Sequence, residues 1–330
     1  MLEGTKFLGR QLLRQAIWET CNRHRPGGQP NIALIGSRRS GSTLLMQILG
    51  RARGMKTINQ PFAPAVATAH QLTHLPWPAG GFFLEPESEE RDALKDYIKK
   101  ITSGSIHVQE SWRFWSSDFH FRTSRCVLKT TDAHYLEALF EEMGFLIVRY
   151  FRHPVPQAIS CRRNGWDDKL AHFRARSGFV DAVLSEPQRE IFERIRHGGQ
   201  ALERFVLGWC CENLPLFRPV SSGGITVFYE DLVQRPEATI SMVAEHCSLT
   251  VTKKMEKMAG RPSVSVKTLS AASTRDAIKS GNTKSVVSRW THQLTPPEID
   301  SIQRILDCFP GCPYRSQNAT RHISFQNVSG

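Results

Sequence analysis

A phosphate-binding pattern stands near the start of the sequence. Residues 36–43 read Gly-Ser-Arg-Arg-Ser-Gly-Ser-Thr and follow a short apolar run at 32–35. The segment matches the phosphate-loop template G-x-x-x-x-G-K-[ST], except that Ser42 takes the place of the lysine. Backbone N–H groups of such a loop, together with the N-terminus of the following helix, form a cradle for an anion. The segment therefore predicts a binding site for a phosphate-like group.

The cations of this loop distinguish it from a nucleoside triphosphate site. In triphosphatases the template lysine reaches the β- and γ-phosphates, and Mg²⁺ bridges them. Here the positive charge lies inside the loop, on Arg38 and Arg39, and no apolar strand clearly ends in an aspartate that could hold Mg²⁺. The strongest apolar run, 145–148, leads into Arg149 and Arg152 instead. These features favour a nucleotide 5′-phosphate that bears a small anionic group and is neutralised by side-chain cations.

Three further segments carry a recognisable pattern. Ser160 follows Arg152 by eight positions, across the end of a predicted strand and the helix after it. Tyr229 begins a Tyr-Glu-Asp-Leu run, and residues 281–290 lead from a glycine to a tryptophan. Taken singly, Arg152 could be an exposed charge in the turn at the start of a helix, and the Tyr229 segment by itself is better explained as a strand end followed by a helix cap. The inference therefore depends on the motifs occurring together.

Short apolar runs alternate with helix-like segments along the chain. Strands are expected at 32–35, 126–129, 145–148 and 224–228, and helices at 44–49, 135–143, 154–163, 187–209 and 236–246. This alternation predicts an α/β fold with a mainly parallel central sheet and helices on both faces. Ligands bind beyond the carboxyl ends of the strands in such sheets. Each motif described above falls at such an end.

Together the motifs resemble those of the sulfotransferases that use 3′-phosphoadenosine-5′-phosphosulfate (PAPS). The resemblance covers roughly residues 30–310, with the motifs in the family's order. It implies the sulfotransferase fold with a P-loop-like loop for the phosphosulfate. It also implies transfer of a sulfuryl group from PAPS, without a metal, to a hydroxyl or amine of a carbohydrate or another small molecule.

The resemblance assigns roles to single residues. The phosphosulfate would contact Ser37, Arg38, Arg39, Ser40, Gly41, Ser42 and Thr43, and the 3′-phosphate would contact Arg152 and Ser160. Tyr229 would lie near the adenine, while Lys279 and Lys284 would add basic contacts to the 3′-phosphate. Arg39 stands where the family carries a lysine. Because arginine does not readily give up a proton, its expected role is electrostatic stabilisation of the leaving phosphate.

The motifs leave more than one choice for the base that removes the acceptor proton. Many cytosolic members carry Lys-Thr-His before the central strand, whereas this chain has Lys129-Thr-Thr131-Asp132-Ala-His134. We expect His134 or Asp132 to act as the base and Lys129 to contact the transferring group, although His134 could equally lie on a helix surface. Other branches use a glutamate where this chain has Gln60. Weaker alternatives are Glu110 and His107.

The composition limits the class of protein and its partners. The 330 residues are 40% hydrophobic and 22% charged, as in an ordinary globular protein. A net charge of +12 favours anionic partners. No nucleic-acid-binding motif accompanies it, so a nucleotide ligand explains the charge and no nucleic acid partner is expected. A P-loop kinase and a basic nucleic-acid-binding protein are the alternatives.

The remaining features concern domains and location. We expect an N-terminal helical extension at 1–30, a sulfotransferase domain at 31–315 and a tail at 316–330. The eight cysteines are scattered, which predicts reduced thiols. With no membrane-spanning or signal-type segment, the expected location is cytoplasmic. The sequence leaves open whether the chain forms a homodimer.

Overall fold

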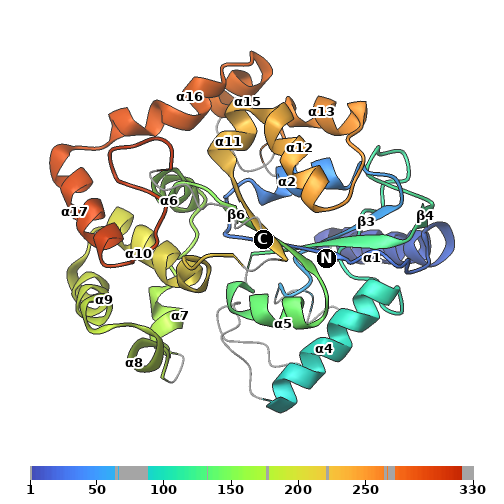
Figure 1. The fold of residues 1–330 in the computed structure, drawn as a ribbon, viewed down its shortest axis with the longest axis horizontal. Helices are drawn as coiled ribbons and strands as arrows, with labels where there is room; N and C mark the ends of the chain where they lie inside the picture. Colours follow the sequence, from blue (N-terminus) through green and yellow to red (C-terminus); the bar gives the residue numbers. More distant parts are fainter. Residues whose placement is uncertain are drawn as a thin grey trace.

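A five-stranded parallel sheet in the order β3-β5-β2-β6-β7 forms the centre of the fold (Figure 1). The computed structural model describes residues 2–63, 66, 88–131, 133–175, 178–220, 223–263, 266 and 272–321. The strands are β2 (Ile32–Gly36), β3 (Met55–Asn59), β5 (Arg125–Thr130), β6 (Leu146–Phe151) and β7 (Gly224–Phe228). Helices cover both faces of the sheet. The predicted α/β class is confirmed.

The register of the sheet brings three loops to one edge. The central strand β2 pairs with β5 and β6, so that Ile35 lies opposite Thr130 on one side and Arg149 on the other. All three strands run in the same direction, and the segments that follow them leave the sheet next to one another. The phosphate-loop pattern, the segment after Thr130 and the start of the Arg152 motif therefore meet at this edge.

Side chains of β2 alternate between two hydrophobic cores. Ile32 and Leu34 pack in one cluster with residues of α2 (Ser42–Leu49), α12 (Pro236–His246) and α13 (Lys253–Ala259). Ala33 and Ile35 belong to the other, which includes residues of α4 (Ser88–Ser103), α5 (Glu137–Glu142) and α10 (Ala201–Asn213). Because successive strand residues point to opposite faces, a strand covered on both sides must be apolar throughout. All five residues of β2 are buried, which explains its unbroken apolar sequence.

The other elements surround these layers. They include α6 (Pro154–Arg163), α11 (Tyr229–Gln234), α15 (Ala272–Lys279), α16 (Thr283–Ser288) and η3 (Arg289–Gln293). The rest are η1 (His134–Leu136), α7 (Leu170–Ala175), α8 (Phe179–Val183), α9 (Glu186–Gly198), η2 (Leu214–Leu216) and α17 (Pro296–Asp307). A short parallel pair, β1 (Arg23–His24) and β4 (Arg122–Thr123), lies beside α1 (Leu2–Cys21).

Two elements differ from the pattern read in the sequence. The apolar spacing at 187–209 is divided between α9 and α10, because Gly199 and Gln200 are both extended and Gln200 begins α10 with a capping box. Strand β6 continues to Phe151, so Arg149 lies within the strand instead of following it. Its guanidinium is buried and donates 2.6 Å from Nε to Glu137 Oε2, which gives this arginine a structural role.

The N-terminal helix α1 packs against the domain at its C-terminal half. Trp18 is buried, and its Nε1 donates to the carbonyl oxygen of Ser111 at 3.2 Å.

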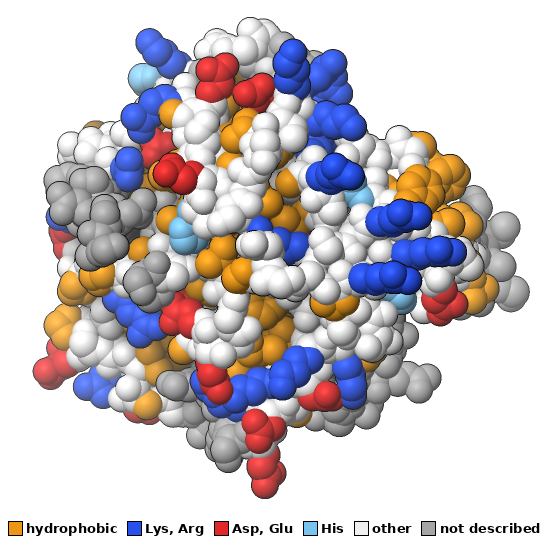
Figure 2. Space-filling view, turned by 45° about the vertical axis from the view of Figure 1, so that its right-hand side comes forward, with side chains coloured by type: hydrophobic (Ala, Val, Ile, Leu, Met, Phe, Trp, Pro, Cys, Tyr) orange, Lys and Arg blue, Asp and Glu red, His pale blue; other side chains and the backbone are white. Residues whose placement is uncertain are grey.

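None of the helices in the described ranges combines the length and the apolar character needed to cross a bilayer. The eight cysteines are all free, in agreement with the expected thiols. Figure 2 shows Lys and Arg side chains in separate groups on one face, with Asp and Glu between them.

Candidate active site

The loop after β2 has the backbone shape of an anion-binding turn. Arg39 has a φ of 62° and Gly41 a φ of 96°, and α2 begins at Ser42. Both values lie in the left-handed region, which arginine adopts only when its surroundings hold it there. Alternation between right- and left-handed residues turns successive N–H groups toward one side. The loop and the first turn of α2 together can therefore hold an anion.

Two glycines allow this loop to approach its neighbours closely. A Cβ on Gly36 would lie 2.7 Å from the carbonyl oxygen of Tyr150 on β6. A Cβ on Gly41 would lie 2.6 Å from Cδ2 of Tyr229, the first residue of α11. Neither position can carry a side chain without displacing backbone or a buried ring. The glycines of the pattern are thus explained by packing as well as by turn geometry.

The Arg152 motif is in direct contact with this loop. Arg39 Nε donates to Ser160 Oγ at 2.9 Å, and Arg152 Nη1 donates to the carbonyl oxygen of Arg39 at 2.9 Å. The Arg152 guanidinium also lies over the ring of Tyr229, with Cζ 4.3 Å from the ring centre. Four residues from three separate sequence motifs are therefore brought together: Arg39, Arg152, Ser160 and Tyr229.

A further arginine, which no sequence motif singled out, joins this cluster. Arg289 begins η3. Burial, and next the positive charge of Arg152, lower the pKa of the Arg289 guanidinium. Burial and then the charge of Arg152 likewise lower the pKa of Arg39. Lys284, which we expected in this role, is exposed on α16, and the side chain of Lys279 lies outside the described residues. The one signal for Arg289 in the sequence is its place directly before Trp290.

A buried polar chain runs from the loop into α10. Ser37 Oγ lies 3.4 Å from Nε2 of His134 and accepts a hydrogen bond of 2.7 Å from Asn213 Nδ2. On the other side of the imidazole, His134 Nδ1 lies 4.0 Å from Oε1 of Glu212, which forms an ion pair with Lys169. His134 is only 1% exposed, so it does not lie on a helix surface.

The charge state of Glu212 follows from its partners. Burial by itself would raise the pKa of this carboxyl, but the positive charge of Lys169 and the attraction of His134 outweigh burial and hold the pKa below its ordinary value. Glu212 is therefore a carboxylate at neutral pH, and it faces the imidazole from the side opposite Ser37. Neither Glu212 nor Lys169 was predicted, because neither belongs to a motif.

Gln60 and Thr131, the two positions that the family resemblance compared with a glutamate and a histidine, face each other here. Gln60 Nε2 donates to Thr131 Oγ1 at 2.8 Å, so both positions hold neutral side chains. Lys129, on β5, is buried and its Nζ donates to Asn59 Oδ1 at 3.2 Å. Asp132, the other candidate base, lies outside the described residues. Glu110, a weaker alternative, is paired with Lys56 at 2.7 Å.

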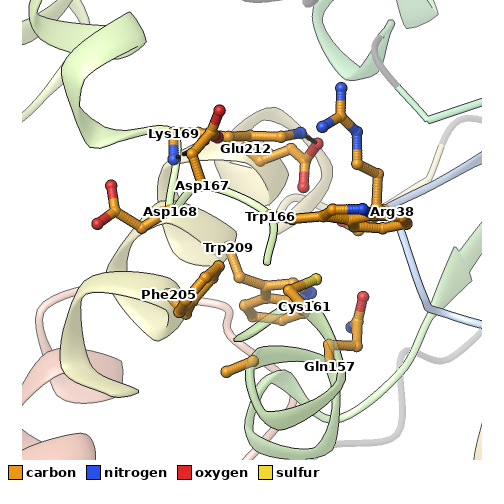
Figure 3. Close-up of a pocket in the computed structure, with 13 residues that line it drawn as sticks. Arg38, Gln157, Cys161, Trp166, Asp167, Asp168, Lys169, Phe205, Trp209 and Glu212 are labelled. Atoms are coloured by element: carbon orange, nitrogen blue, oxygen red, sulfur yellow. Dashed lines mark hydrogen bonds and ion pairs between the residues drawn. The ribbon is translucent and has the colours of Figure 1, made fainter. Parts of the chain in front are cut away.

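A cleft adjoins the loop (Figure 3). Ser37 and Arg38 form its wall on the loop side, and α6, the segment 166–169 and α10 form the others. Trp166 and Trp209 contribute indole rings to it. The arginine cluster adjoins the cleft, since Cζ of Arg39 lies 5.9 Å from the ring centre of Trp166. The described part of the chain contains no group of three or more His, Cys, Asp or Glu side chains arranged to hold a metal ion.

Comparison with known proteins identifies the family. The profile described as "Sulfotransferase family" matches residues 30–253, which is more than half of the chain. The chain therefore belongs to the sulfotransferase family, and it is a sulfotransferase enzyme. The match includes the loop, the Arg152 motif, His134, Glu212 and Tyr229. No curated protein sequence matches the chain.

Three of the solved structures similar to this chain are described as sulfotransferases. Mouse sulfotransferase SULT7A1 complexed with PAP is 11% identical, with a TM-score of 0.41, and the match covers 90% of this chain and 88% of that one. The sulfotransferase domain from the curacin biosynthetic pathway is 17% identical, with a TM-score of 0.42 and coverage of 85% and 98%. Sulfotransferase STF1 from Mycobacterium tuberculosis H37Rv is 16% identical, with a TM-score of 0.32 and coverage of 82% and 81%.

Proposed function

We propose that this sulfotransferase uses PAPS as its donor and transfers the sulfuryl group to an acceptor hydroxyl in the cleft beside Ser37. The 5′-phosphosulfate would lie in the loop at residues 37–43 and on the N-terminus of α2. The 3′-phosphate would lie on Arg152, Ser160 and Arg289. The adenine would lie near Tyr229.

One observation carries the donor assignment. The loop and the Arg152 motif share two hydrogen bonds, from Arg39 to Ser160 and from Arg152 to the Arg39 carbonyl, each of 2.9 Å. The two anion-binding groups that a bisphosphorylated nucleotide requires are therefore neighbours. PAP, with which the mouse sulfotransferase is complexed, is the product that this donor would leave.

The electrostatics of the cluster also favour a polyanion. Arg39, Arg152 and Arg289 are close enough for the charge of Arg152 to lower the pKa of the other two. Guanidinium groups in this state repel one another and are partly removed from water. Two phosphate groups would relieve both effects through charge-assisted hydrogen bonds, each of which contributes roughly 1.5–3 kcal/mol.

Sulfuryl transfer, like phosphoryl transfer, requires mainly that the reacting groups are positioned and that the charge developing in the transition state is stabilised. An acceptor oxygen would attack sulfur in line, forming the new O–S bond as the bond from sulfur to the phosphate oxygen breaks. The electron pair would go to the leaving phosphate, beside the loop N–H groups and Arg39. The acceptor proton would go to Nε2 of His134, with the carboxylate of Glu212 stabilising the imidazolium that forms.

Calorimetric titration with PAP tests the donor site directly. We expect Arg152→Ala to weaken PAP binding by roughly 10- to 100-fold, because one charge-assisted contact is lost. Arg162→Ala is the matched control, since this exposed arginine lies two residues beyond Ser160 on the same helix. ATP with Mg²⁺ is the competing ligand. Binding of ATP·Mg²⁺ in preference to PAP, or equal PAP affinity in wild type and Arg152→Ala, would refute the proposal.

A further inference from the structure

The cleft beside the loop has two tryptophan rings in its walls. Trp166 belongs to the segment after α6, and Trp209 lies on α10 (Figure 3). In Figure 3 their rings stand on opposite sides of the space between them, with Phe205 at its edge. A slot between aromatic rings accepts a flat or chair-shaped ring of low charge through dispersion and desolvation.

Two buried polar atoms in this cleft have no hydrogen-bond partner among the described residues. One is Nε1 of Trp209, a donor, and the other is Oε1 of Gln157, an acceptor. The two side chains are only 6% and 3% exposed, respectively. Figure 3 shows both atoms at the same end of the cleft, near Cys161. Buried polar groups are normally satisfied, so this pair indicates a ligand that supplies both an acceptor and a donor.

The orientation of the Gln157 amide is fixed by its other contact. Its Nε2 donates to the carbonyl oxygen of Arg152 at 2.7 Å, so the buried oxygen is the end of the amide that has no partner among the described residues. An indole N–H can only donate, and an amide oxygen can only accept. A hydroxyl group satisfies both, because its oxygen accepts from Trp209 while its hydrogen is donated to Gln157.

The charges that line the cleft disfavour a strongly anionic ring. Its lining includes two cations, Arg38 and Lys169, and three carboxylates, Asp167, Asp168 and Glu212. Asp168 is neutralised by Arg204 at 2.6 Å. Positive and negative charges nearly balance among the lining residues, which favours a neutral occupant.

We propose, on the basis of the function proposed above, that the acceptor is a neutral ring with at least two hydroxyl groups, that is, a sugar. One hydroxyl lies at the Ser37 and His134 end and receives the sulfuryl group. A second hydroxyl lies between Trp209 Nε1 and Gln157 Oε1 and fixes the orientation of the ring. An acceptor with a single hydroxyl satisfies only one of these two positions.

Sulfate transfer from labelled PAPS tests this assignment with a panel of probes. The probes are 4-nitrophenyl glycosides of glucose, galactose and N-acetylglucosamine, monodeoxy analogues of the best of them, and 4-nitrophenol as the acceptor with one hydroxyl. In the wild type we expect one deoxy position to abolish transfer and a second to raise KM by roughly 10- to 100-fold. Trp209→Phe keeps an aromatic ring and removes the N–H, so this variant should no longer distinguish the second deoxy analogue from its parent.

The controls separate failure of this inference from failure of the donor assignment. Trp209→Phe should bind PAP as the wild type does, and Trp18→Phe, which removes a buried indole distant from the cleft, should leave acceptor KM unchanged. Absence of PAP binding in the wild type would count against the donor. If the protein binds PAP, any of three results would overturn the sugar assignment. These are a preference for 4-nitrophenol, no transfer to any glycoside, and equal sensitivity of wild type and Trp209→Phe to the second deoxy analogue.

Discussion

Substitution of Gly41 by alanine tests the packing of the loop against α11. At a φ of 96°, an alanine lies outside the region that L-residues adopt readily, at a cost of roughly 1–2 kcal/mol. Its Cβ would also lie 2.6 Å from Cδ2 of Tyr229. Displacing a buried ring adds roughly 1–3 kcal/mol. The free energy of unfolding should therefore fall by roughly 2–5 kcal/mol.

Gly144→Ala isolates the backbone part of this effect. Gly144 has a φ of 76°, and a Cβ there would meet no atom within 4 Å. Urea unfolding should give a loss of only roughly 1–2 kcal/mol for this variant. In a double-mutant cycle, Gly41→Ala and Tyr229→Leu should couple by roughly 1–3 kcal/mol, because the smaller side chain relieves the clash. If Gly41→Ala costs no more than Gly144→Ala, or if the cycle shows no coupling, then the ring of Tyr229 is not held against the loop.

Three other variants test the buried polar groups. Lys169→Met should lower the free energy of unfolding by roughly 3–5 kcal/mol by leaving Glu212 unpaired, and adding Glu212→Leu should recover most of the loss in urea titrations. Burial lowers the pKa of His153 to about 3, so the unfolded state binds a proton that the folded state does not, and stability falls as the pH drops below about 6.5. His153→Asn should remove roughly 2–3 kcal/mol of the loss between pH 7 and 4.5, and an unchanged loss would contradict the assignment. His134→Gln should reduce kcat by roughly 10²- to 10⁴-fold with unchanged PAP affinity; full activity would exclude this residue as the base.

The phosphate-binding loop could be predicted because its signal is local. The glycines, the arginines and the helix start all lie within residues 36–43, and the turn depends on these residues themselves. The eight-residue spacing from Arg152 to Ser160 is also local, since one strand end and one helix contain both. The parallel sheet could be predicted from the unbroken apolar runs, because a strand that is covered on both faces must be apolar throughout.

Contacts between distant segments could not be predicted in the same way. Glu212 and Lys169 are 43 residues apart, and nothing in the sequence pairs them. Arg149 and Arg152 look alike in the sequence, but Arg149 is inside β6 and binds Glu137, whereas Arg152 follows the strand and reaches the loop. The choice between Lys284 and Arg289 depends on how α16 and η3 are packed, which residue type alone does not determine.

Under the proposed function, helix α6 would contact both substrates. Gln157 lines the cleft proposed for the acceptor, and Ser160, three residues later on the same helix, contacts Arg39, where the donor is proposed to bind. A helix of this length moves as one body, so any shift of α6 that one ligand causes displaces the contacts of the other. The affinities of the proposed nucleotide and acceptor would then be thermodynamically linked, and each ligand would change the binding of the other by the same factor.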